Sequence, residues 1–377
     1  MFKRFNKASK TSQAPEGRLC TLKSQKGRKT TFHALTVTQV VKETEDCVSV
    51  AFESPADFTF VPGQHLTLKA DIDGESIRRS YSLCSNPVNE DLTVAIKCVE
   101  GGKFSTWAQN LQVDDVMQSM PPMGGFTLEP NSKKKRHIVC FAAGSGITPV
   151  LSIIKTTLSQ EPDSTISLFY GNKNSGSIIF KSALENLKDA YMVRLEVRHV
   201  LSREDQGSAL LYGRMDRKKL EQMARSFPDI AKADEAFICG PESMIHAASD
   251  VLIASGLKKK QIHFELFTAA TPTMENHATT MEKSSGQHEV TVILDDEETH
   301  VSQSGKTAIL DAALKAGADV PFACKGAVCC TCRAKILEGT VNMDLNYSLT
   351  DEEVAEGFVL TCHSFPTSEK VVVSYDE

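Results

Sequence analysis

The chain has 377 residues, of which 41% are apolar and 24% are charged, and its formal net charge at pH 7 is −6. This length excludes a peptide-sized module and leaves room for two or three domains. Because no run of about 18 apolar residues is free of charge and no apolar segment follows the N-terminus, we expect no membrane span, no membrane partner and no secretion, and therefore a cytoplasmic protein.

Residues 1–30 differ from the rest of the chain in charge. They carry nine basic residues and one acidic residue, whereas residues 288–377 carry six basic and sixteen acidic residues. We expect residues 1–30 to be a basic extension, either disordered or docked to an acidic partner. The extension has no aromatic residues besides Phe2 and Phe5, so we expect no nucleic-acid partner.

Residues 31–132 contain short segments in which apolar and polar residues alternate. This pattern, interrupted by turn residues, predicts a small antiparallel β-barrel. The predicted strands are 32–41, 47–52, 65–70, 80–84 and 92–98, and one helix is predicted at 103–111.

Residues 133–267 alternate between apolar runs and helical patterns, which predicts an α/β domain with a parallel sheet covered on both faces. The predicted strands are 137–142, 165–170, 193–200, 235–239 and 261–266, and the predicted helices are 147–158, 182–187, 217–224 and 242–254. Such a sheet binds ligands at the carboxyl ends of its strands.

Residues 268–287 are polar and rich in Thr and Ser, which predicts a flexible linker. The last predicted domain, 288–377, contains a hairpin-like pair of strands at 289–294 and 299–302, a helix at 307–316, and closing strands at 333–337 and 370–375. This mixture predicts a small α+β domain.

Four of the eleven cysteines have the spacing of an iron–sulfur site. Cys324, Cys329 and Cys332 form C-x4-C-x2-C, and Cys362 follows after 29 further residues. This is the plant-type spacing for a [2Fe-2S] cluster; the alternatives are a zinc site or unligated thiols. Cys330 would shift the register, but a one-residue spacer strains two ligands on one iron, so we predict that Cys330 is not a ligand.

The run from Arg79 to Leu83, R-x-Y-S-L, has the side chains that a flavin needs. Tyr81 can form a wall for the isoalloxazine, Ser82 can hydrogen-bond at N5, and Arg79 can neutralise the pyrophosphate. The alternative is a tyrosine in the barrel core. We predict FAD binding by Arg79, Tyr81, Ser82 and Leu83.

A glycine pair about twenty residues later strengthens this prediction. Gly101 and Gly102 precede the predicted helix at 103–111, and Ser105 lies in its first turn. Amides at a helix start bind phosphate, so Gly102 and Ser105 are predicted to bind the FAD pyrophosphate. An ordinary hairpin turn is the alternative.

Two glycine motifs at strand ends predict a nicotinamide dinucleotide site. The predicted residues are Gly144, Gly146, Ser202, Arg203, Cys239, Gly240 and Pro241. A 2′-phosphate on Arg203 would select NADPH over NADH, with Arg214 as a second candidate and a solvated arginine as the alternative.

Through these motifs, residues 32–377 are identified as a member of the ferredoxin-NADP reductase family with a plant-type ferredoxin domain at the C-terminus. Within it, the chain is most similar to the reductase subunits of phenylacetyl-CoA epoxidases. The resemblance is carried by the R-x-Y-S run and by FHALTV (32–37), PGQHL (62–66), GSGITP (144–149), YGN (170–172), FICGP (237–241) and NYSL (346–349).

The resemblance implies a β-grasp fold for the ferredoxin domain and roles for three further residues. Thr148 is implied to lie near the flavin and the nicotinamide, Cys239 beside the nicotinamide, and Phe267 over the flavin. Ser82, Thr148 and Cys239 are the implied catalytic residues. Cys330 departs from the family pattern, in which a small residue is usual.

We therefore expect an oxidoreductase that passes electrons from NADPH through FAD and a [2Fe-2S] cluster to the di-iron subunits of a monooxygenase, as the resemblance to phenylacetyl-CoA epoxidase reductases implies. The same modules serve other oxygenases, so a reductase of a ketosteroid hydroxylase or a Rieske dioxygenase remains an alternative. A redox sensor is a third hypothesis, but a sensor needs no hydride-transfer site.

Overall fold

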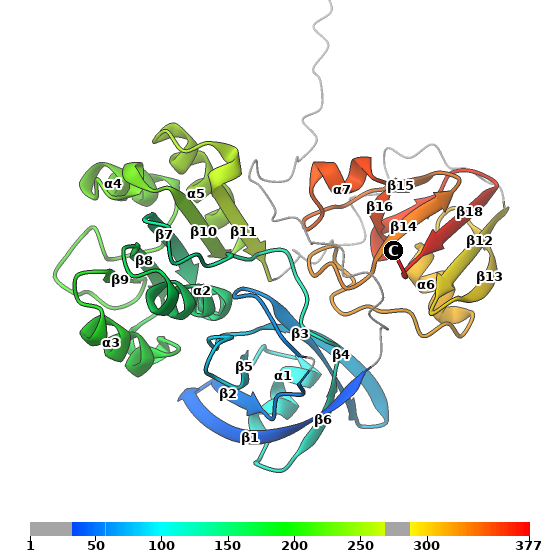
Figure 1. The fold of residues 1–377 in the computed structure, drawn as a ribbon, viewed down its shortest axis with the longest axis horizontal. Coiled ribbons are helices and arrows are strands. Elements are labelled where there is room, and N and C mark those ends of the chain that lie inside the picture. The colour runs from blue at the N-terminus through cyan, green and yellow to red at the C-terminus, as the bar shows by residue number, and fades with distance from the viewer. Residues whose placement is uncertain (1–31, 57, 268–286) are drawn as a thin grey trace, which may run out of the picture.

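The computed structural model describes residues 32–56, 58–267 and 287–377, which form three lobes (Figure 1). The predicted basic extension at 1–30 lies outside the described residues, as does the predicted linker except for Gln287. That residue begins a strand of the third lobe.

The first lobe is the predicted antiparallel barrel. Its strands are β1 (His33–Thr44), β2 (Cys47–Phe52), β3 (His65–Ile72), β4 (Glu75–Ser82), β5 (Leu92–Lys97) and β6 (Val116–Ser119). They pair in the order β4-β3-β6-β1-β2-β5, and a bridge from Leu83 to Val94 closes the sheet. The helix predicted at 103–111 is α1 (Lys103–Trp107) followed by a short 3₁₀ turn.

The β3–β4 hairpin begins β4 five residues before the predicted strand. Asp73 and Gly74 both have positive φ, 54° and 78°, which is the geometry of a two-residue turn that matches the twist of the flanking strands. The turn sets eight consecutive pairs from His65–Ser82 to Ile72–Glu75. Polar residues at the start of β4 concealed this part of the strand from the alternation pattern.

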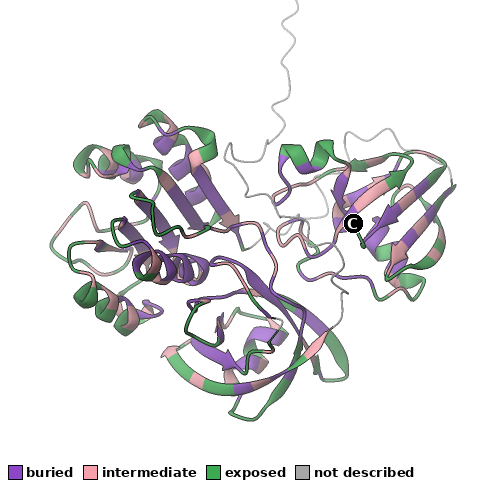
Figure 2. Ribbon diagram, viewed as in Figure 1, coloured by how far each residue is buried: buried purple, intermediate pink, exposed green. Residues whose placement is uncertain are grey.

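The second lobe is the predicted parallel sheet with helices on both faces. Its elements are β7 (His137–Ala143), α2 (Ile147–Gln160), β8 (Thr165–Asn172), α3 (Lys181–Ala190), β9 (Leu195–Leu201), α4 (Arg217–Ser226), β10 (Glu235–Gly240), α5 (Glu242–Ala254) and β11 (Ile262–Leu266). The strand order is β11-β10-β7-β8-β9, so the direction of winding reverses between β7 and β10. One apolar cluster joins the sheet to α2 and α3, and another joins it to α4 and α5. Figure 2 shows buried strands between helices whose outer faces are exposed.

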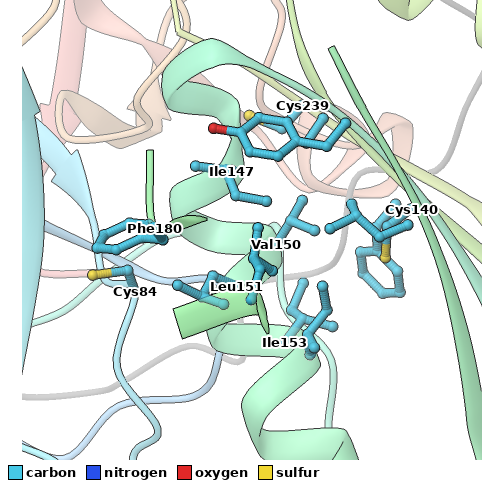
Figure 3. Close-up of a cluster of buried hydrophobic side chains, with 14 of the residues drawn as sticks. Cys84, Cys140, Ile147, Val150, Leu151, Ile153, Phe180 and Cys239 are labelled. Atoms are coloured by element: carbon cyan, nitrogen blue, oxygen red, sulfur yellow. The ribbon is translucent and has the colours of Figure 1, made fainter. Parts of the chain in front are cut away.

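The barrel and the α/β lobe share one apolar core. Cys84 of the barrel lies in the same cluster as Ile147, Val150 and Leu151 of α2 (Figure 3). The Ser152 hydroxyl also donates to the Ser85 carbonyl at 2.7 Å. A shared core of this kind fixes the relative position of the two lobes.

The third lobe is a mixed sheet with α6 on it. Its elements are β12 (Gln287–Leu294), β13 (Glu297–Ser304), α6 (Ile309–Lys315), β14 (Arg333–Glu338), β15 (Val341–Met343), α7 (Asp351–Ala355), β16 (Phe358–Leu360), β17 (Ser364–Pro366) and β18 (Lys370–Ser374). The main sheet has the order β13-β12-β18-β14-β16. Its side chains Val328 and Tyr347 pack on the α/β lobe, so the three lobes meet at one junction.

Candidate functional site

Strand β4 presents the predicted flavin residues. Tyr81 packs on Phe104 with ring centroids 5.6 Å apart, and Arg79 is exposed, with one guanidinium nitrogen donating to the Arg78 carbonyl at 2.7 Å. Leu83 is fully buried in the barrel core. Arg79 and Tyr81 therefore lie on one face of β4, as alternation predicts.

Ser82 lies at the end of β4 and contacts the α/β lobe. Its hydroxyl donates to the Glu265 carboxylate at 3.2 Å, across 183 residues of sequence. Burial is the main cause that raises the pKa of Glu265 to about 8; the Ser82 hydrogen bond opposes this rise and the charge of Cys329 adds to it. Near neutral pH this carboxyl is therefore largely protonated.

Gly102, which directly precedes α1, and Ser105, in the first turn of α1, form a tight helix start. The Ser105 hydroxyl accepts from the Val99 amide at 3.0 Å and donates to the Gly102 carbonyl at 3.2 Å. A Cβ on Gly102 would lie 2.6 Å from the Ser105 oxygen, so the loop requires glycine there. The hydroxyl predicted to meet the pyrophosphate thus orders the loop.

A cavity of about 1010 Å³ lies at the carboxyl edge of the parallel sheet, where the winding reverses. It brings together the following predicted residues: Gly144, Gly146, Ser202, Arg203, Gly240, Pro241 and Phe267. Its volume is that of a site for a large organic cosubstrate.

Cations line the same cavity. Arg203 and Arg214 have no ion pair among the described residues, so both are available to a phosphate. Lys97 of β5 also reaches the cavity, although it pairs with Asp46 at 3.3 Å. The sequence did not predict Lys97, because nothing local indicates that a barrel strand ends at this cleft.

Two predicted residues do not line the cavity. Cys239 is fully buried in the core, and burial raises the pKa of its thiol well above the usual value. Thr148 is also buried, and its hydroxyl donates to the Ser145 carbonyl at 3.0 Å. Both support the glycine loop: a Cβ on Gly146 would lie 2.2 Å from the Cys239 carbonyl oxygen.

The four predicted cluster ligands converge as two pairs. Cys324 and Cys329 are close enough to affect each other's titration: the Cys324 thiol lowers the pKa of Cys329, and the pKa of Cys324 is raised. The neighbouring Cys332 thiol raises the pKa of Cys362, and the charge of Cys324 also raises it. The two pairs are thus close neighbours.

The loop that holds three of these thiols has an unusual backbone. Lys325, Ala327 and Cys330 have positive φ values of 51°, 59° and 53°. Such conformations are costly for residues with a Cβ and are held in place by their surroundings. The Gly326 amide lies 3.3 Å from the Cys324 sulfur, as expected of a loop whose amides face sulfur.

Cys330 makes its hydrogen bond outside the set of four predicted ligands. It is enclosed, and its thiol donates to the Ser348 carbonyl at 3.4 Å. That Cys330 is a neighbour of the ligands and not a ligand stays a prediction.

This thiol arrangement fits a two-iron cluster. A mononuclear zinc site needs about four ligands around one centre, whereas a [2Fe-2S] cluster takes two thiolates on each iron.

In the part of the chain that the structure describes, no helix is long and apolar enough to cross a bilayer.

Family comparisons assign all three lobes. Residues 34–128 match an oxidoreductase FAD-binding domain, residues 141–250 an oxidoreductase NAD-binding domain, and residues 292–367 a 2Fe-2S iron-sulfur cluster binding domain. The fold resembles that of phthalate dioxygenase reductase, with a TM-score of 0.54 and 21% identity over 91% of this chain and 98% of that one. The three matches define an oxidoreductase of the flavin- and iron–sulfur-dependent class.

Two curated relatives narrow this class. The chain is 44% identical to the E component of the 1,2-phenylacetyl-CoA epoxidase of Escherichia coli (strain K12), over 92% of this chain and 98% of the relative. It is 33% identical to the ferredoxin reductase component of 3-ketosteroid-9-alpha-monooxygenase from Mycobacterium tuberculosis, over 91% and 96% of the two chains. The chain belongs to the family of oxygenase reductase components that includes this epoxidase component, which confirms the predicted family, fold class and cofactor domains.

Proposed function

We propose that this protein is the NADPH-dependent reductase of a di-iron monooxygenase of the phenylacetyl-CoA epoxidase type. One observation carries the proposal: the end of β11 separates the nucleotide cavity from the cluster loop. Phe267 lines the cavity, whereas Glu265, two residues earlier, lines a small pocket together with Cys329. The nucleotide site and the cluster site are thus adjacent.

The residues around this junction suit the transfer of electrons in sequence. FAD accepts two electrons as hydride and releases them singly, and the cluster carries one at a time. Tyr81 and Arg79 would hold the flavin, the Gly144–Gly146 loop would hold the nucleotide phosphates, and Phe267 would cover the flavin until nicotinamide displaces it. The domain limits 31–132, 133–267 and 288–377 remain part of this proposal.

Ser82 and Glu265 would order the polar side of the flavin. Because Glu265 is protonated near neutral pH, it adds no negative charge to a site that receives electrons. Thr148 and Cys239 would act by shaping the glycine loop rather than by touching the reacting atoms.

Arg203 and Arg214 support the preference for NADPH. Both line the cavity and are exposed, and a 2′-phosphate would supply the anion that each lacks. NADH would bind without this ion pair, and therefore more weakly.

The partner proposal rests on the 44% identity to the epoxidase component. The acidic charge of residues 288–377 would steer the cluster lobe to a basic surface on the oxygenase subunits. The ten described cysteines form no disulfide, which suits the reducing cytoplasm in which we place the protein.

The test is product formation from phenylacetyl-CoA, detected by mass spectrometry, in a mixture of this protein, NADPH and purified epoxidase oxygenase subunits. Cytochrome c reduction by the same preparation is the control. A product with one added oxygen atom supports the partner assignment. Reduction of cytochrome c without oxygenated product contradicts the partner assignment and favours an oxygenase of the ketosteroid type.

A further inference from the structure

The face of β4 opposite Arg79 and Tyr81 contacts the cluster lobe. Arg78 lies on this opposite face, and only 8% of its side chain is exposed. A guanidinium has five N–H donors and stays charged, so a buried arginine requires partners. Its partners come from a distant part of the sequence.

The segment 319–322, just before the first cluster cysteine, surrounds this guanidinium. Arg78 donates to the Val320 carbonyl at 3.2 Å and forms an ion pair with Asp319. The Phe322 ring centroid lies 4.7 Å from the guanidinium carbon, and the ring of Phe32 lies 4.9 Å away on the barrel side. The planar guanidinium therefore combines hydrogen bonds, an ion pair and ring contacts, which a lysine cannot reproduce.

A second contact joins the same hairpin to the cluster loop itself. The hydroxyl oxygens of Thr67 in β3 and Thr331 lie 3.3 Å apart, and Thr67 is also 3.3 Å from Ser80 of β4. Thr67 is 0% exposed and Thr331 is 4% exposed. Thr331 immediately precedes the ligand Cys332, so this buried contact reaches the cluster loop directly.

We propose that the β3–β4 hairpin is a two-sided docking element in which Arg78 latches the cluster lobe to the back of the flavin strand. Arg79 and Tyr81 on one face of β4 hold the flavin, Arg78 on the other face holds the segment 319–322, and Thr67 of the neighbouring β3 meets Thr331. Arg78 is a positioning residue: it touches neither substrate nor cofactor but fixes the separation of the flavin and the cluster. The proposal rests on the proposed electron route, and it is independent of which oxygenase is the partner.

Arg78 can be replaced without leaving an unpaired buried charge on the cluster lobe. The side chain of Asp319 is 72% exposed, so water solvates its carboxylate when Arg78 is replaced. Loss of Arg78 therefore weakens docking without leaving a buried unpaired charge on the third lobe.

The first test is hydrogen–deuterium exchange of the full-length chain. Arg78→Ala should raise exchange about tenfold in peptides covering 65–82 and 319–332, because the amides there become exposed as the lobes separate. Peptides covering β9 should not change. Arg78→Lys should show a smaller rise, and Lys42→Ala, which removes an exposed cation from β1, should show none.

The second test follows electrons in the loaded protein without an oxygenase. In Arg78→Ala, flavin reduction by NADPH should stay within about twofold of the wild-type rate, whereas appearance of the reduced-cluster signal in freeze-quenched samples should slow about 10- to 100-fold. Each cluster reduction moves one electron, so without an oxygenase one electron of each hydride reaches the cluster and the other stays on the flavin. Asp319→Asn should give the same split to a smaller extent, because it removes only the exposed ion pair and leaves the barrel and the Val320 contact untouched.

Unchanged exchange and unchanged cluster reduction in both Arg78→Ala and Asp319→Asn would overturn the latch. Loss of FAD from Arg78→Ala would also overturn it, since Arg78 would then belong to the flavin site. If Arg78→Ala does not fold, Asp319→Asn alone decides. A wild-type protein whose cluster NADPH cannot reduce would instead contradict the proposed function, while the exchange data would still decide the docking contact.

Discussion

The nucleotide cleft and the cluster loop differ sharply in the space that they leave. The cleft has a volume of about 1010 Å³ and is lined by glycines and exposed cations. The pocket beside Cys329 has only about 20 Å³ and is closed by all three lobes. A cosubstrate that enters and leaves at every turnover needs an open site, whereas a resident cluster needs a loop that surrounds it.

Backbone geometry is used differently in the two regions. At Gly146 the absent Cβ allows the turn between β7 and α2 to approach the end of β10. In the cluster loop, Lys325, Ala327 and Cys330 adopt positive φ despite having a Cβ. The cleft therefore depends on a residue that has no Cβ. The cluster loop instead adopts strained backbone conformations, and its surroundings and the bound cluster offset their cost.

The largest effect should follow replacement of a cluster ligand. Cys332→Ser should abolish the cluster, because one iron then lacks a thiolate. Iron and sulfide analysis should show complete loss, while flavin reduction by NADPH continues in the open cleft. A full complement of iron in this variant would contradict the ligand assignment.

The second-largest effect should follow a substitution that narrows the nucleotide cleft. In Gly146→Ala the new Cβ would lie 2.2 Å from the Cys239 carbonyl, so we expect flavin reduction by NADPH to slow about 100-fold as the loop is displaced. Gly176→Ala is the matched control, since its Cβ would meet only Asn174 at 3.6 Å. Stopped-flow rates measure both variants, and equal rates would show that the loop tolerates the shift.

Glu265, which lies between the two regions, should make stability depend on pH. Its pKa in the folded protein, about 8, is above the ordinary value of 4.5, so its contribution to the free energy of unfolding is complete below pH 4.5 and is lost as the pH rises toward 8. At about 1.4 kcal/mol for each pKa unit, we expect a loss of a few kcal/mol over this window. Glu265→Gln should flatten the profile of unfolding midpoint against pH; an unchanged profile would assign the slope to other groups.

A smaller effect is expected from the cations of the cleft. Arg203→Ala should raise the KM for NADPH about tenfold, equivalent to one lost ion pair with the 2′-phosphate, and leave the KM for NADH unchanged. The same KM measurements on Arg214→Ala show which of the two arginines binds the 2′-phosphate. Equal catalytic efficiency of the wild-type protein with NADH and NADPH would remove the basis for both.

The smallest effect is expected from replacing Cys330, which lies in the same loop as the predicted ligands but is predicted not to be a ligand. Cys330→Ala removes only a half-buried thiol that donates to the Ser348 carbonyl, so the visible absorbance of the cluster should be retained in full. It also serves as the control for Cys332→Ser. Loss of the absorbance would mean that Cys330 is a ligand.

The sequence predicted what local patterns encode. Alternation and helical periodicity located the strands of the barrel and of the parallel sheet, and cysteine spacing identified four thiols that converge. Strands β6, β15, β16 and β17 were not predicted, because three or four residues are too few for a periodic pattern.

Contacts between distant segments could not be predicted in the same way. Ser82 meets Glu265 across 183 residues, and Thr67 meets Thr331 across 264 residues. These pairs depend on how the lobes dock, which no local pattern records. For the same reason the sequence did not predict that Lys97 lines the cavity. It did predict Cys239 there, but Cys239 does not line the cavity.

The turn at Asp73 and Gly74 has a consequence far from its own position. Side chains on a strand alternate, so inserting one residue between this turn and Arg78 would exchange the two faces of β4. Arg79 and Tyr81 would then point toward the cluster lobe, and Arg78 toward the flavin, although every side chain of both sites would still be present. A single-residue insertion between this two-residue turn and Arg78 would therefore disconnect the flavin from the iron–sulfur cluster.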